Sequence, residues 1–168
     1  MRAGRGCLAG LLLLAAVSSG ADARSRDAKI EQIERSLAHA GPAATLRKFF
    51  NCNNGIGWDL VSSGEPRAVK IAFALMPETD ACYSEIMSIV LGQALSNNPE
   101  LMLGYYAKYP KSFPEWCVPG LIGPTDAEWK AAVDKAEHAI RSVHDPALAK
   151  AEEICLTEVA RARTMPPG

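Results

Sequence analysis

The pattern of apolar and polar positions from Gly64 to Asn98 predicts two buried helices joined by a sharp turn. Pro66 suits the first helical position, where its missing N–H costs no hydrogen bond, and Pro77 ends the first apolar run. Thr79 or Asp80 can cap the helix that follows. Apolar residues cover most of the second helix's circumference: Cys82, Ile86, Met87, Ile89, Val90, Leu91, Ala94 and Leu95. A helix with so little polar surface is usually buried, so we expect this second helix to be the packing centre.

Proline, glycine and capping residues divide the rest of the chain into short helical segments. Thr125 to Glu128 form a capping box that opens a long helix, and an irregular connector is expected from Lys111 to Gly123. The other expected helices are residues 27–40, 43–51, 58–63, 99–109 and 145–163. No stretch alternates with period two. The chain is therefore predicted to be all-α, an irregular bundle of about seven to nine helices.

The segment from Gly64 to Leu103 consists of short expected helices with proline-marked turns, and in this it resembles the helix pairs of HEAT-type repeats. The resemblance covers about a quarter of the chain and includes no specific motif. No second copy follows at a fixed period. We therefore interpret the chain as an irregular bundle and not as a solenoid.

The first residues have the features of a secretory signal peptide. Arg2 and Arg5 precede an apolar run from Leu8 to Val17, and Ala21-Asp22-Ala23 gives a small-x-small cleavage pattern. The apolar run is too short to span a membrane, so we expect no membrane insertion. We predict that residues 1–23 are the signal peptide and residues 24–168 a single helical domain. The expected location is periplasmic or secreted, and the alanine-, arginine- and glycine-rich composition favours a bacterial source.

Four cysteines follow the predicted cleavage site: Cys52, Cys82, Cys117 and Cys155. An even number in an exported chain predicts two disulfides, with buried free thiols as the alternative. Three pairings are possible. We favour Cys52–Cys82 with Cys117–Cys155, because neighbours in sequence tend to pack together in helical hairpins. The spacing contains no C-x-x-C motif, so no metal site is expected.

Charge and motifs narrow the possible functions. The chain has 18 basic and 19 acidic residues and a net charge of −1, so no nucleic-acid partner is expected. None of the common catalytic, metal or nucleotide-binding motifs occurs, and we expect no cofactor. Glu85 is the weak candidate for a catalytic acid, because it lies within the most apolar helix. The alternative is that Glu85 belongs to a solvated edge of that helix with Ser84, Ser88 and Gln93.

An aromatic-rich segment, residues 105–116, is the candidate binding surface. Aromatic residues are enriched at interface hot spots, and Tyr106, Phe113 and Trp116 cannot all easily face the central helix. The alternative is that these rings belong to the core. We therefore favour a non-catalytic protein-binding module of the bacterial cell envelope, of immunity or inhibitor type, over an enzyme. The alternatives are a small secreted hydrolase acting on glycan or lipid and an envelope assembly factor; the sequence does not indicate the oligomeric state.

Overall fold

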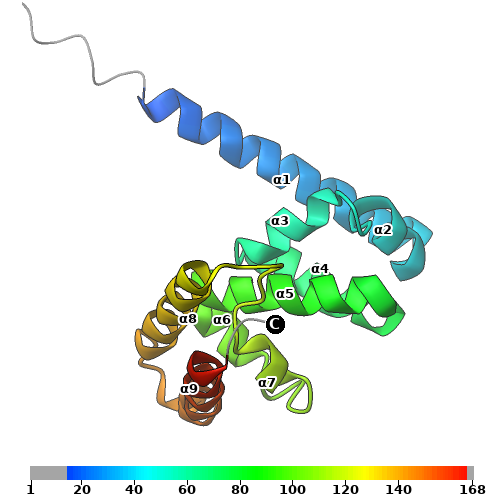
Figure 1. The fold of residues 1–168 in the computed structure, drawn as a ribbon. Coiled ribbons are helices and arrows are strands. Elements are labelled where there is room, and N and C mark those ends of the chain that lie inside the picture. The colour runs from blue at the N-terminus through cyan, green and yellow to red at the C-terminus, as the bar shows by residue number, and fades with distance from the viewer. Residues whose placement is uncertain (1–14, 166–168) are drawn as a thin grey trace, which may run out of the picture.

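A computed structural model of the chain describes residues 15–165, and within this range the protein is entirely helical (Figure 1). The nine α-helices are α1 (Ala15–Ala40), α2 (Pro42–Phe49), α3 (Ile56–Ser62), α4 (Pro66–Leu75), α5 (Ala81–Asn97), α6 (Pro99–Gly104), α7 (Phe113–Trp116), α8 (Asp126–Arg141) and α9 (Ala149–Thr164). Two short 3-10 helices, η1 (Met76–Glu78) and η2 (Pro146–Leu148), precede α5 and α9. The prediction of an all-α bundle of about seven to nine helices is confirmed.

Helix α5 is the packing centre, as its apolar circumference predicts. It contacts α3, α4, α6, α7 and α8, and Figure 1 shows it crossing the middle of the molecule. The side chains of Met87, Leu91, Ala94 and Leu95 are at most 2% exposed. The core is one hydrophobic cluster to which all nine α-helices contribute residues. Elements on either side of α5 are therefore held together mainly through this helix.

Side-chain caps and prolines start several helices. The Glu65 carboxylate accepts a hydrogen bond from the Ala68 N–H at 2.7 Å, with Pro66 as the first residue of α4. Thr125 and Glu128 form the expected capping box at α8, in which the Thr125 N–H donates to Glu128 Oε2 at 2.8 Å. Asp80 directly precedes α5, but its side chain makes no capping hydrogen bond. Local sequence rules therefore place most helix starts.

Helix α1 begins earlier than the sequence pattern predicts. The expected helix covers residues 27–40, whereas α1 begins at Ala15 and passes through the predicted cleavage site. Residues 21–29 are all exposed, and Figure 1 shows the first half of α1 extending beyond the other helices. Among residues 21–40 of α1, Ile30 is the first buried residue. Residues 1–14, which hold the basic and most of the apolar part of the predicted signal peptide, lie outside the described residues, so the signal peptide stays a prediction.

The region after α5 differs from the expected boundaries. The helix expected over residues 99–109 ends at Gly104, and the expected irregular connector contains the short helix α7. Glycine is a weak helix former, and the Tyr105 ring that follows it stacks on Phe73 of α4 with a centroid distance of 4.0 Å. Tertiary packing of aromatic rings therefore ends α6 and turns the chain toward α7.

Both disulfides have the predicted pairing. Cys52–Cys82 joins the loop between α2 and α3 to the first turn of α5, with a Cα–Cα distance of 6.2 Å. Cys117–Cys155 joins the residue after α7 to the middle of α9, with a Cα–Cα distance of 4.8 Å. Over residues 15–165, no helix has both the length and the apolar character needed to cross a membrane.

Candidate functional site

The candidate catalytic acid, Glu85, is exposed on the first half of α5. Its neighbour Ser84 is also exposed, while Ser88 and Gln93 are half-buried. This arrangement matches the solvated edge that we gave as the alternative interpretation. Two hollows lie near α8 and the end of α9, and Glu85 lines neither of them. It therefore lacks the enclosed, apolar surroundings that adjust a carboxyl group for acid catalysis.

The three aromatic residues of the candidate binding surface do not form an exposed patch. Phe113 is 1% exposed and Trp116 is 3% exposed, while Tyr106 is half-buried. The Tyr106 and Phe113 rings meet edge to face with centroids 5.2 Å apart, and Trp116 packs edge to face on Phe73 at 5.2 Å. Formation of α7 turns Phe113 and Trp116 inward. Of the three side chains, only Tyr106 keeps partial access to solvent.

Residues 117–125, which follow α7 and are called the connector from here on, are held against α5 by close backbone contact, and Figure 1 shows them crossing that helix. A Cβ atom added to Gly92 would lie 2.4 Å from the Val118 carbonyl oxygen. A Cβ atom added to Gly120 would lie 2.6 Å from the Ile89 Cα. Gln93 Nε2 also donates a hydrogen bond to the Gly120 carbonyl at 3.1 Å. The two glycines therefore allow the connector to lie directly on the central helix.

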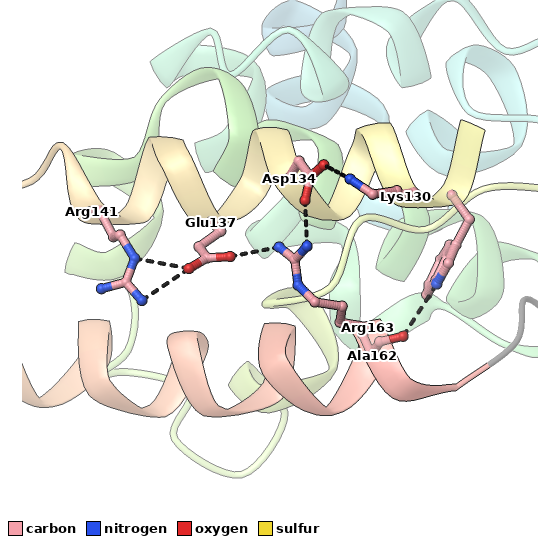
Figure 2. Close-up of polar contacts among 7 residues, drawn as sticks. Lys130, Asp134, Glu137, Arg141, Ala162 and Arg163 are labelled. Atoms are coloured by element: carbon pink, nitrogen blue, oxygen red, sulfur yellow. Dashed lines mark hydrogen bonds and ion pairs between the residues drawn. The ribbon is translucent and has the colours of Figure 1, made fainter. Parts of the chain in front are cut away.

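Trp129, in the first turn of α8, lies between the connector and α9. Its indole Nε1–H donates a hydrogen bond to the Ala162 carbonyl near the end of α9, at 3.2 Å (Figure 2). The Trp129 side chain is half-buried. This hydrogen bond satisfies the polar edge of the ring and leaves part of its apolar surface open to solvent.

A hollow of about 490 Å³ lies between the connector, α5, α7 and α9, and we call it the connector hollow. Its apolar lining consists of Ile89, Pro114, Val118, Pro119, Leu121, Pro124, Trp129, Ala162 and Met165. Its polar lining includes Ser88, Glu115, Glu158 and Arg161. A second hollow of about 510 Å³ adjoins it and shares Trp129 and Met165 with it.

Two strongly exposed apolar side chains belong to the same part of the molecule. Ile122, in the connector, is 84% exposed, and Met165, which lines both hollows, is 50% exposed. Arg161 and Glu158 form an ion pair at 2.8 Å at the edge of the connector hollow. A concave apolar surface with a few polar groups at its edge is the usual form of a ligand or partner site. The connector hollow is therefore the candidate functional site.

A network of charged side chains holds the last turn of α9 to α8 (Figure 2). Arg163 donates to Asp134 Oδ1 and to Glu137 Oε2, both at 2.6 Å. Lys130 pairs with Asp134 at 2.6 Å and Arg141 pairs with Glu137 at 2.9 Å, both within α8. The network fixes the end of α9, and with it Met165, beside the connector hollow.

Hydrogen bonds within this network change the acidity of its carboxyl groups. Hydrogen bonds from Lys130 and then Arg163 lower the pKa of Asp134. Hydrogen bonds from Arg141 and Arg163 lower the pKa of Glu137. The hydrogen bond to Asp134 is the main cause that raises the pKa of Arg163. Both carboxylates are thus stabilised in their charged form in the folded protein.

We expect the contribution of Arg163 to stability to disappear in acid. The folded protein binds protons at Asp134 and Glu137 less readily than the unfolded chain, so stability falls as the pH drops through the two lowered pKa values. Arg163→Gln should reduce the urea midpoint at about pH 7, but much less at about pH 2, well below the ordinary carboxyl pKa of about 4. Arg35→Gln is the control, because the ion pair of Arg35 with Glu31 at 3.7 Å joins two exposed side chains within α1. An equal loss for Arg163→Gln at both pH values would contradict a role for these ion pairs.

The described residues contain no group of three or more His, Cys, Asp or Glu side chains that could hold a metal ion. Sequence reasoning did not select Ile122, Trp129 or Arg163 as site residues. Trp129 occurs at helical spacing with Val133, which predicts a packing face and does not reveal that one ring remains partly open. The available signal was the pair Leu121-Ile122, two apolar residues between glycines in a proline-rich connector.

Comparison of the chain with protein-family models, with curated proteins and with solved structures finds no match.

Proposed function

We propose that the protein is an exported, non-catalytic protein-binding module of the bacterial cell envelope, and that its partner binds at the connector hollow. The observation that supports this most directly is the open apolar lining of the hollow, which includes Leu121, Trp129 and Met165, with the exposed Ile122 directly after Leu121 in the chain. Exposed apolar surface that gathers in one place commonly marks a site of protein interaction. An immunity or inhibitor role, in which the protein shields the envelope from a secreted toxin or hydrolase, suits these features.

The chemistry of the hollow favours an apolar side chain of the partner, flanked by polar groups. Trp129 offers a partly open ring, and tryptophan is enriched among interface hot spots. Around it, Glu115, Glu158 and Arg161 supply both signs of charge for hydrogen bonds to the partner's backbone or polar side chains. Such an arrangement gives affinity through apolar burial and specificity through the polar edge.

Two further observations support an exported binding protein. The Cys117–Cys155 bridge lies fully in the core, and structural disulfides of this kind are typical of oxidising compartments. Glu85, the least improbable acid for a hydrolase, is exposed and lies outside both hollows, so the hydrolase alternative draws no support from it.

The proposal is tested by placing a charge in the exposed apolar surface. Ile122→Asp should weaken partner capture from envelope extract about tenfold or more, because a buried carboxylate loses its hydration on binding. Ile56→Asp is a matched control, since Ile56 is also an exposed isoleucine, 41% exposed, but lies on α3. Both variants should unfold within about 0.5 kcal/mol of the wild type, as surface substitutions usually do.

The comparison of the two variants decides the outcome. Loss of the same captured protein with Ile122→Asp and its retention with Ile56→Asp would support the connector hollow as the binding site. Equal capture by Ile122→Asp and wild type would contradict it.

A further inference from the structure

The two disulfides differ strongly in their access to solvent. Cys117 and Cys155 are both 0% exposed. Cys82, in contrast, is exposed, and its partner Cys52 is half-buried. Thiol–disulfide exchange requires a thiolate to reach one sulfur of the bridge, so access controls its rate. Only the Cys52–Cys82 bridge is open to such an attack in the folded protein.

The loop that carries Cys52 has hydrogen bonds of its own. The Asn51 side-chain oxygen accepts from the Asn53 N–H at 3.1 Å and the Asn54 N–H at 3.0 Å. The Asn51 carbonyl accepts from the Gly55 N–H at 3.2 Å and from the Trp58 indole at 3.0 Å. These contacts do not involve α5. The loop therefore keeps its main local contacts when the bridge to Cys82 is broken.

The helix that carries Cys82 is also held independently of the bridge. The Tyr83 and Ser84 N–H groups donate to the Asp80 carbonyl at 2.8 and 3.2 Å, and Ser84 Oγ donates to the Ala81 carbonyl at 2.8 Å. Further along, Met87 and Leu91 anchor α5 in the core. Opening of Cys52–Cys82 therefore requires no unfolding on either side, whereas access to Cys117–Cys155 requires the core to open.

We infer that Cys52–Cys82 is a thiol-exchange site, at which a low-molecular-weight thiol forms a mixed disulfide with the exposed Cys82. The thiolate attacks Cys82 Sγ, a new S–S bond forms, the Cys52–Cys82 bond breaks, and Cys52 leaves as a thiolate that takes a proton from water. A second thiolate then attacks the sulfur atom that the first thiol molecule contributed to the mixed disulfide. This releases Cys82 as a thiolate, which takes up a proton. The thiol is thereby oxidised to its disulfide while the bridge is reduced by two electrons. Neither cysteine lines the connector hollow, so this site is independent of the proposed binding function.

The test uses the folded, oxidised protein and reduced glutathione. After short exposure to millimolar glutathione at about pH 8, free thiols are blocked with iodoacetamide and the cysteine peptides are mapped by mass spectrometry. We expect glutathione on Cys82, the iodoacetamide label on Cys52, and an intact Cys117–Cys155 bridge. The Cys52–Cys82 bridge should open at least about tenfold faster than the buried one, and denaturant should remove this difference.

Two variants keep the test decisive. A Cys52→Ser variant with oxidised glutathione should form the adduct at Cys82, and a variant carrying both Cys52→Ser and Cys82→Ser should form none within residues 24–168 while folded. Circular dichroism verifies that both remain helical. Equal rates of opening for the two bridges, or glutathione found on Cys52 and not on Cys82, would overturn the assignment.

Discussion

Loss of the buried Cys117–Cys155 disulfide is expected to destabilise the protein more than loss of the exposed Cys52–Cys82 disulfide. The two bridges close segments of similar length, with sequence separations of 38 and 30 residues. On the basis of chain entropy alone, removal of either costs about 3–4 kcal/mol. Any difference in the stability lost on removing each bridge must therefore come from the surroundings of the sulfur atoms.

The surroundings of the sulfur atoms predict a larger loss of stability when the buried Cys117–Cys155 bridge is removed. Cys117 and Cys155 are both 0% exposed, so Cys117→Ala with Cys155→Ala removes two sulfur atoms from the core and leaves unfilled space. This adds about 1–2 kcal/mol to the entropic cost. Cys52→Ala with Cys82→Ala is the matched control, since it opens a similar loop at the surface. Urea unfolding of the two double variants measures the difference directly, and an equal or reversed order would contradict the assigned burial.

Phe113→Ala is a single substitution for which we expect a large loss of stability. The Phe113 side chain is 1% exposed and packs against Tyr106 and Trp116, with centroids 5.2 and 6.0 Å away. Truncation of such a ring costs about 3–5 kcal/mol, because apolar contacts are lost and a cavity remains. Thermal or urea unfolding measures the change.

Two comparisons identify the cause of that loss. Phe113→Leu should recover most of the lost stability, because leucine refills much of the space. Tyr106→Ala should cost only about half as much as Phe113→Ala, since the tyrosine side chain is half-buried. A Phe113→Ala variant that loses less than about 1 kcal/mol would show that the ring is not part of the core.

The sequence predicts those parts of the fold that depend on local rules. The apolar circumference of α5, the capping box at Thr125 and Glu128, and the prolines at helix starts are local signals, and each has the expected place in the structure. The disulfide pairing also follows from proximity along the chain. These features need no knowledge of distant contacts.

The candidate site depends on contacts that local rules do not contain. Phe113 and Trp116 turn inward because α7 forms against Phe73, which lies far earlier in the sequence. The connector hollow requires Gly92 in α5, the connector and the end of α9 to meet. Tertiary packing therefore decides which aromatic residues are buried and which apolar surface stays open. For this reason the aromatic segment was a plausible surface in the sequence and is largely core in the structure.

Photocrosslinking from position 122 tests the central claim most directly. A benzophenone amino acid in place of Ile122 keeps an exposed apolar group next to Leu121, which lines the connector hollow, and the same substitution at Ile56 serves as the control on α3. Irradiation in envelope extract should give a discrete adduct with one partner protein from position 122 and none of that adduct from position 56. The absence of an adduct from position 122, or the same adduct at equal yield from position 56, would contradict a partner site at the connector hollow.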